Sequence, residues 1–551
     1  MYRKVLIVFT ILIFGAGHAT AQNLDNPGKP VTISGSLGGN LSFYDMNGIP
    51  ARRNPYGYSL FGNVNLRIYG VSLPFSVAIN QQGSRFSQPF RQIGVSPQYK
   101  WAKLHLGHRI MRFSEFTLNN VTFLGAGTEL TPGKFRFSAM IGRFREARES
   151  AGDLFRIPQY ERNGYAISAG YGKETYVDVV FFKAADKRNS ISNPDEIEGL
   201  ATPEANTAIG LKGGVEVVKH RLRFEYDVGA SAFTRNLNAT ALDLTSGTLS
   251  DFRNLADINQ SSNVAGAANT ALRYRNGAYN AGLEYRYIQP GYQSLGVNYL
   301  LSDLEMITVS GGGQFFENKV GVQASYGKQN NNLSERNFAT TGRDIGSLNV
   351  TVRATEKLNI NAGYSNFSIY QTLILDTLFA DSVVIDQTNH QLNLSATYLI
   401  MGDGKVHSIG INTNFQDLSD RRETAEVSSA TQMINVNLSY GLRFNSSGIG
   451  LRGSASYQDF ASQLIGQQRY AFSLGGSGAF FDKKLTLRLS QTYNLSVLEM
   501  RDNDHIHSTR ITAGYKVAAR HTVSLSAAST SRQGNNDFTE SRVSVGYRMQ
   551  F

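Results

Sequence analysis

The chain has 551 residues, no cysteine and a formal net charge of +11, and 41% of its residues are hydrophobic. A mean hydropathy of -0.26 excludes a bundle of membrane-spanning helices, and the lack of cysteine excludes a fold held by disulfide bonds. The 54 glycines, 27 tyrosines and 32 phenylalanines instead suit a transmembrane β-barrel, in which only alternate residues meet lipid.

The chain begins with the pattern of a secretory signal peptide. Two basic residues precede an apolar run from Val5 to Ala16, and small residues follow at Ala19 and Ala21. The run is shorter than the roughly 20 apolar residues that a membrane anchor needs. We therefore predict a cleaved signal peptide over residues 1–21 and a short N-terminal segment over residues 22–30.

From residue 31 to residue 551 the chain repeats one pattern. Apolar and polar residues alternate in runs of about ten, which are separated by Gly, Asn, Asp and charged turns. Such runs predict antiparallel hairpins. Short turns, such as residues 445–448, alternate with longer loops, such as residues 370–386 and 416–430. Transmembrane barrels show this asymmetry, with short turns on the periplasmic side and long loops outside.

The sequence therefore predicts an all-β fold, a transmembrane antiparallel up-and-down barrel of roughly 24–26 strands without a plug domain. Pro74 and Pro97 blur the pattern between Gly70 and Trp101, which leaves the strand number open. A water-soluble β-sandwich array would need a second sheet over each apolar face. A β-solenoid would need a constant repeat length, which the sequence lacks.

The last predicted strand carries apolar side chains up to the final residue. Alternate residues of a strand share a face, and one face here collects Val543, Val545, Tyr547, Met549 and Phe551. This tail resembles the C-terminal insertion signal of Gram-negative outer-membrane β-barrels, and the chain looks like the large porin-like barrels of Bacteroidota. The resemblance implies a location in the cell outer membrane, insertion by the barrel-assembly machinery, and contact with outer-membrane lipid and lipopolysaccharide.

The opposite face of the predicted strands is rich in arginine. Inward positions are predicted for Arg223, Arg273, Arg275, Arg286, Arg353, Arg443, Arg452, Arg488, Arg542 and Arg548. The clear inward carboxylates are fewer, namely Glu225, Asp227 and Glu284. Arginine rings in a pore attract anions and repel cations, so this excess predicts selectivity for anions. The alternative is that these arginines pair with inward acids and only stiffen the wall.

The predicted width raises the question of what occupies the lumen. Barrels of 16 to 18 strands already leave an aqueous channel. Only residues 22–30 precede the first predicted strand, which is too few for a plug domain. We therefore expect infolded loops, above all the longest one from Asn236 to Val264, or a partner protein to fill part of the lumen.

Motifs of catalysis are weak, and we predict no enzyme, no cofactor and no metal site. His505 and His507 share one strand face, as two metal ligands can, but they stand beside an outer loop, where a solvated rim is the simpler interpretation. The sequence contains neither a G-x-S-x-G nucleophile elbow nor a nucleic-acid-binding module. An enzyme would require a serine, a histidine and an acid that converge on one face.

Two functions remain open at this point. The first is an outer-membrane channel for passive diffusion of small polar, anionic solutes. The second is a structural or translocation scaffold in a multi-protein secretion or assembly complex, in which a lipoprotein or periplasmic partner fills the lumen.

Overall fold

The computed structural model describes residues 31–81, 90–149, 158–192, 201–242, 255–373, 385–420, 429–463, 465–499, 502–534 and 536–551. The predicted signal peptide and the segment after it, residues 1–30, lie outside the described residues.

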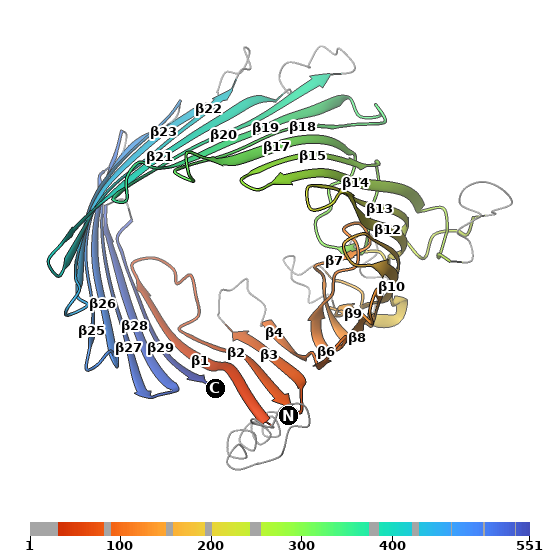
Figure 1. Ribbon diagram of the computed structural model, residues 1–551, viewed down its shortest axis with the longest axis horizontal. Helices are drawn as coiled ribbons and strands as arrows, with labels where there is room; N and C mark the ends of the chain where they lie inside the picture. The colour runs from red at the N-terminus through yellow and green to blue at the C-terminus, as the bar shows by residue number, and fades with distance from the viewer. Residues whose placement is uncertain are drawn as a thin grey trace.

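The described strands close into a single antiparallel barrel (Figure 1), in which consecutive strands pair with one another. The strands of the barrel are β1 (Val31–Asn47), β2 (Tyr56–Ile68), β3 (Val71–Gln81), β4 (Phe90–Val95), β5 (Gln98–Tyr99), β6 (Ala102–Ile110), β8 (Thr122–Leu130), β9 (Phe135–Arg145), β10 (Arg162–Gly172), β11 (Tyr176–Asp186), β12 (Ala205–Val218), β13 (Leu222–Thr234), β14 (Ser262–Asn276), β15 (Tyr279–Ile288), β17 (Leu304–Phe315), β18 (Val320–Asn331), β19 (Ala339–Arg353), β20 (Leu358–Leu373), β21 (Asp386–Gly402), β22 (Lys405–Asp420), β23 (Thr431–Phe444), β24 (Gly450–Ser462), β25 (Gly466–Phe480), β26 (Leu485–Leu498), β27 (Asp504–Ala518), β28 (His521–Gln533) and β29 (Phe538–Gln550).

One position of the barrel is shared by two short strands. The sheet contains 27 strands, but β4 and β5 both lie between β3 and β6. The barrel therefore has 26 strand positions, at the upper end of the predicted range. Pro97 stands in the break between β4 and β5, because proline cannot donate the ladder hydrogen bond that a continuous strand needs there.

The first and last strands close the barrel. The register of β1 and β29 runs from Ser36 opposite Gln550 to Asn47 opposite Thr539. The backbone N–H of Phe551 extends it by donating to the carbonyl of Gly35 at 2.9 Å. Closure pairs the edges that an open sheet would expose, which is required of any sheet that crosses hydrocarbon.

The two mouths of the barrel differ in their connections. Every second connection is a short turn at the same mouth, which we call the short-turn end, and the longer connections lie at the other mouth, the long-loop end. The turn from β17 to β18 shows how the tight hairpins form: Phe316, Glu317 and Asn318 have φ values of 51°, 56° and 66°. This left-handed backbone suits the twist of a tight hairpin.

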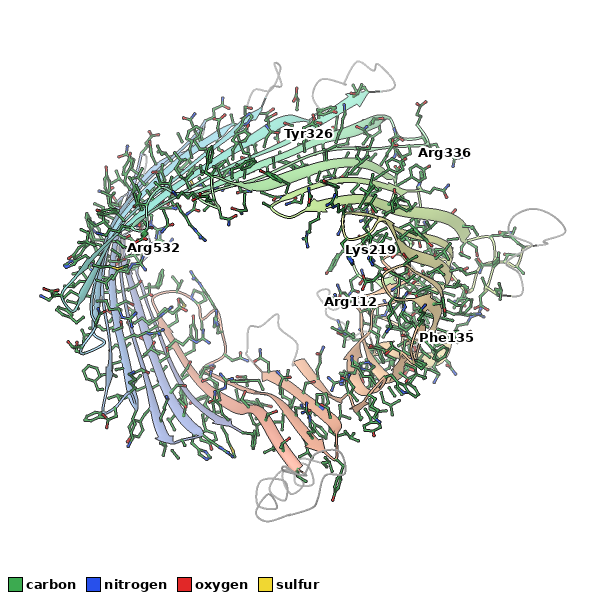
Figure 2. All side chains as sticks on the ribbon, in the orientation of Figure 1. Arg112, Phe135, Lys219, Tyr326, Arg336 and Arg532 are labelled. Atoms are coloured by element: carbon green, nitrogen blue, oxygen red, sulfur yellow. The ribbon has the colours of Figure 1, made fainter. Side chains whose placement is uncertain are left out.

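The outer face is an exposed apolar belt between aromatic residues. Near the short-turn end it exposes Phe135, Tyr171, Tyr274, Tyr279, Phe315, Tyr398, Tyr440, Phe480, Tyr515 and Tyr547, and nearer the long-loop end Tyr165, Tyr285, Tyr326 and Tyr364. Phe135 and Tyr326 point away from the ring in Figure 2. Leucine, isoleucine and valine side chains such as Leu283 and Val309 are exposed between the two groups. Aromatic girdles around an apolar band are characteristic of barrels in lipid.

Helical structure is almost absent from the described residues. The only helix described there is the single turn η1 (Arg188–Ser190), and none is long and apolar enough to cross a membrane.

The barrel lumen as candidate functional site

Two connections from the long-loop end fold into the lumen and form what we call the inner layer, residues 111–121 and 289–303. Each contains a short strand, β7 (Leu118–Asn119) in the first and β16 (Gly296–Val297) in the second, and the two strands pair in parallel. β7 lies inside the ring in Figure 1, and Arg112 projects inward in Figure 2. Phe116 and Leu118 are fully buried in this layer.

The wall beneath the inner layer is apolar instead of polar. Val180 and Phe182 of β11 occupy inward register positions and are 0% exposed. They form one cluster with Phe113 and Leu118 of the layer and with Met140 of β9. The strict alternation of outward apolar and inward polar residues therefore fails here, because the layer covers the inward face. Burial of each large apolar side chain stabilises this contact by about 1.5–3 kcal/mol.

Polar contacts attach the layer to the wall. The carboxylate of Asp227 on β13 accepts from the Ser114 hydroxyl at 2.6 Å and from the backbone N–H of Glu115 at 2.8 Å. Glu115 in turn pairs with Arg286 of β15 at 2.5 Å. The ammonium group of Lys212 on β12 donates to the carbonyl of Phe113. The first segment of the layer is therefore held on three strands of the wall, β12, β13 and β15.

The second segment is bonded to the wall, for example through Ser231, which donates to the carbonyl of Gln293 at 2.6 Å, and also to the first segment. The Tyr292 hydroxyl donates to the carbonyl of Phe116 at 2.7 Å, and the Ser294 hydroxyl donates to the carbonyl of Thr117 at 2.6 Å. Burial raises the pKa of Tyr292, so its hydroxyl keeps the proton that this bond requires. The two segments thus form one unit that narrows the lumen from one side.

The expectation for the longest loop, Asn236 to Val264, is wrong in its described parts. The carbonyl of Leu255 accepts from Thr207 and from Lys183, both at 3.2 Å. These two residues pair with each other across β11 and β12, on the face opposite that of Phe182. The described part of the loop therefore lies against the outer face, and the described connections that fold into the lumen are the two shorter ones. Residues 243–254 lie outside the described residues.

The structure places the predicted arginines on the lumen side of the wall, and their neighbours divide them into two groups. The first group is paired. Arg223 and Arg273 both contact Glu225, at 2.8 and 3.4 Å, and Arg286 contacts Glu115. For these arginines, the alternative interpretation of wall-stiffening pairs is the better description.

The second group faces the lumen without an acidic partner. Among the residues that the structure describes, no carboxylate forms an ion pair with Arg275, Arg353, Arg443, Arg452, Arg488, Arg542 or Arg548. Arg548 donates to the Ser36 hydroxyl at 3.0 Å. Arg275 lies on β14, and the others lie on β19 to β29, in the part of the wall that the inner layer leaves uncovered.

Several charged residues of the lumen were not predicted from the sequence. Arg510 of β27 also faces the lumen, since it pairs with Ser490 opposite and precedes the outward Ile511. Asp178 pairs with Arg136 at 2.6 Å, and Glu129 pairs with Lys103 at 3.3 Å. Strand parity was a sufficient signal for Arg510. No sequence pattern marks Glu115, which reaches the lumen through the inner layer.

A recess of about 850 Å³ in the lumen wall gathers part of the second group. Its lining includes Arg443, Arg452, Arg488 and Arg510, together with glycine and serine residues. These four arginines are exposed to solvent. A concentration of unpaired positive charge in a concave wall attracts anions.

The residues of the predicted insertion signal lie on the outer face. Val543, Val545 and Tyr547 are 38%, 41% and 47% exposed. Met549 shares their parity and pairs with Leu37 of β1, and Phe551 follows in the same alternation. A role in insertion stays a prediction.

A serine, a histidine and an acid do converge on the lumen face. The Nε2 of His105 lies 2.7 Å from Glu129, and its Nδ1 lies 3.0 Å from the hydroxyl of Ser96. Serine hydrolases orient the ring the other way, with the acid at Nδ1 and the serine at Nε2. His105 and Ser96 are only 4% and 7% exposed, which leaves little access for a substrate carbonyl. We assign a structural role to these hydrogen bonds, since they join the segment between β4 and β5 to β6 and β8.

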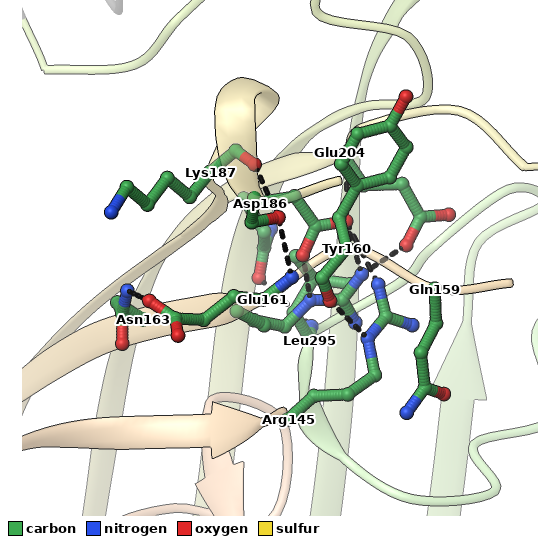
Figure 3. A network of polar contacts seen from close by, with 12 residues as sticks. Arg145, Gln159, Tyr160, Glu161, Asn163, Asp186, Lys187, Glu204 and Leu295 are labelled. Carbon is green, nitrogen blue, oxygen red and sulfur yellow. Dashed lines mark hydrogen bonds and ion pairs between the residues drawn. The ribbon is translucent and has the colours of Figure 1, made fainter. Parts of the chain in front are cut away.

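The most buried ion cluster lies at the long-loop end of β9 to β12 (Figure 3). The side chain of Asp186 is 0% exposed and contacts Arg145 at 2.9 Å and Arg162 at 2.8 Å. Arg162 also contacts Glu204. The cluster lies away from the arginines of the uncovered wall and ties four strand ends together.

His505 and His507 lie at the long-loop end of β27, on the outward register with Tyr493. The Tyr493 hydroxyl lies 2.8 Å from Nδ1 of His505, and its ring lies 4.8 Å from that of His507. The two histidines therefore pack with a rim tyrosine.

Comparison with known proteins finds similar structures but no similar sequences. No protein-family model matches the chain, and no curated protein sequence does so. The barrel is similar to the P pilus usher (PapC) translocation pore, with 11% identity, coverage of 94% of this chain and 99% of that chain, and a TM-score of 0.40. It is also similar to OccAB2 of Acinetobacter baumannii, with 12% identity, coverage of 70% and 98%, and a TM-score of 0.30. OpdK of Pseudomonas aeruginosa, solved with vanillate, gives 10% identity, coverage of 64% and 94%, and a TM-score of 0.31. Similarities of this size carry no argument about function.

Proposed function

We propose that this protein is an outer-membrane channel through which small polar solutes diffuse passively, with a preference for anions. The observation that carries the proposal is the group of arginines on the uncovered wall. They face the lumen, they are accessible, and no described carboxylate neutralises them. Fixed positive charge inside a pore raises the local concentration of anions and repels cations.

The outer face supports the location. Exposed leucine, isoleucine and valine residues between aromatic girdles suit a hydrocarbon environment, whereas in water they would form an apolar patch far larger than soluble proteins tolerate. In this proposal the short-turn end faces the periplasm, the long-loop end faces the exterior, and the apolar residues of β29 guide insertion by the barrel-assembly machinery.

The test is the conductance of the purified protein in a planar lipid bilayer under a salt gradient. We expect a stable conductance, with a reversal potential that shows selectivity for anions over cations. Arg452→Glu and Arg488→Glu should move that potential toward cation preference. Arg336→Glu makes the same charge change in a connection at the long-loop end (Figure 2) and serves as the control, which should leave the reversal potential nearly unchanged. Cation preference in the unaltered protein would contradict the proposal.

The second candidate function is a scaffold whose lumen is filled by a partner. One observation favours it: the described inner layer covers only the wall near β8 to β17 and leaves the wall from β18 to β29 bare. A bare polar wall can bind a lipoprotein or a periplasmic protein as well as water. Folded protein that conducts no ions, but purifies in mild detergent with a partner in fixed stoichiometry, would decide for this candidate.

A further inference from the structure

Five of the unpaired arginines from β23 to β29 lie in two adjacent rows of the strand register. In the row nearer the short-turn end the successive partners are Arg443, Gly450, Ser477 and Arg488. In the next row, two residues further into the barrel, they are Arg452, Gly475, Ser490, Arg510, Ala528 and Arg542. We call Arg443, Arg452, Arg488, Arg510 and Arg542 the arginine track.

The track is inclined to the barrel axis. Arg452 lies two residues from the short-turn end of β24, whereas Arg542 lies eight residues from the short-turn end of β29. The stagger between neighbouring strands of a barrel produces this climb, because a row of paired residues runs obliquely to the axis. The track therefore leads from the short-turn mouth to the middle of the lumen wall.

The register neighbours of Arg452, Arg488 and Arg510 are small and uncharged. Arg452 lies between Gly441 and Gly475. Arg488 lies between Ser477 and Thr512, and Arg510 lies between Ser490 and Ala528. None of these neighbours can neutralise a guanidinium group, and none is large enough to cover it. An anion in the lumen can therefore reach these three arginines, which are exposed.

The spacing of the track favours long ligands over single small ions. Strands lie about 4.8 Å apart, so the six strand steps from β23 to β29 span about 29 Å along the wall. Arg443 and Arg452 are diagonal neighbours on adjacent strands, and so are Arg488 and Arg510, at about 7–8 Å. A single phosphate or carboxylate contacts one such pair at most, whereas a chain of anionic groups contacts several at once.

We propose that the arginine track binds elongated anions that carry several phosphate or carboxylate groups, and that these ligands follow it through the lumen. Guanidinium groups bind both kinds of group through paired hydrogen bonds. Simultaneous contacts raise affinity well above that of one group, because each further contact forms within the complex. This inference rests on the proposed channel function for passage, but the binding itself does not require conduction.

The experiment compares short polyanion chains with their monomers, and measures how strongly each blocks the ion current through the protein. The probes are tripolyphosphate against orthophosphate, and tetragalacturonate against galacturonate. We expect each chain to block at a concentration at least about tenfold below that of its monomer. The double variant Arg452→Gln, Arg510→Gln should lose most of that difference. The matched control is Arg275→Gln, Arg353→Gln, which removes two unpaired lumen arginines outside the track and should retain it.

The possible results distinguish the binding proposal from the channel proposal. Block by one chain and not by the other identifies phosphate or carboxylate as the ligand group and supports the track. Equal block by chains and monomers, or a difference that survives in the track variant, overturns the inference while the channel proposal stands. If the protein does not conduct, titration calorimetry in detergent measures the affinity of the same probes for the same variants. The binding proposal is then tested independently of the channel proposal.

Discussion

At the scale of single residues, Asp186 is the acid on which the long-loop end depends most. Its buried carboxylate accepts from Arg145 and Arg162 and from the backbone N–H of Glu204 at 3.1 Å. Its removal leaves two guanidinium groups without their buried partner, which costs about 3–5 kcal/mol. We expect Asp186→Ala to unfold at clearly lower urea concentration, as followed by the heat-modifiable mobility of the folded barrel.

The control for this measurement is Asp403→Ala, which removes a carboxylate from the exposed short turn between β21 and β22. Surface substitutions of this kind change stability by no more than about 0.5 kcal/mol. Equal stability of the two variants would contradict the assignment of Asp186.

The bonded chain of Ser96, His105 and Glu129 gives a second prediction at this scale. A serine activated by a histidine reacts with fluorophosphonate probes, and we expect no labelling of Ser96. His105→Ala should instead lower the free energy of unfolding by about 1–3 kcal/mol, because it leaves buried polar groups unpaired. Labelling that disappears in Ser96→Ala would overturn the structural assignment.

Sequence parity located individual lumen residues well but said little about their partners. Alternation alone is sufficient to place Arg452 and Arg488, since their flanking residues are outward and apolar. The pairing of Arg286 was not accessible in this way, because its partner Glu115 stands 171 positions earlier in the chain and arrives through a folded connection. Charge balance in a lumen depends on such long-range contacts.

At the scale of elements, the inner layer should set the size of the open pore. Asp227→Ala removes the acceptor for Ser114 and for the backbone of Glu115, at a cost of about 2 kcal/mol for hydrogen bonds to a charged group. We expect single-channel recordings of this variant to show larger and noisier currents, because the first segment can leave the wall.

Glu284→Ala is the matched control for that recording. Glu284 lies on β15, its register partners are Ala271 and Thr308, and no described hydrogen bond joins it to the inner layer. Its removal changes the charge of the same wall without releasing the layer, so currents should stay as steady as in the unaltered protein. Noise of equal size in both variants would rule out the layer as its source.

The sequence does contain a signal for the inner layer in the strands beneath it. Residues 177–185 of β11, VDVVFFKAA, are apolar on both faces, which is the composition of a strand covered on both sides. This composition is overlooked when every inward position of the barrel is assumed to face water. Among the described residues the strands from β18 to β29 have no such cover, and there simple alternation predicts the fold correctly.

At the scale of the whole molecule, assembly should depend on the last residue. Phe551 continues the outward apolar face of β29 and extends the closing ladder through Gly35. We expect deletion of Phe551 to reduce the fraction of heat-modifiable barrel in the outer membrane several-fold, while protein refolded in detergent keeps its conductance. Gln550→Ala changes the neighbouring inward residue and should assemble normally. Normal assembly without Phe551 would contradict an insertion signal that depends on the last residue.

The broken position at β4 and β5 makes the barrel mechanically uneven. β21 and β22 remain in register from Gln387 to Gly402, whereas β4 and β6 share only the pairs Gly94 with Gly107 and Val95 with Leu106. A load that stretches the circumference therefore concentrates on this joint, and its amides should exchange with deuterium before those of the long strand pairs such as β21 and β22. If the wall ever parts to release a molecule sideways into the bilayer, the gap will open between β4 and β6.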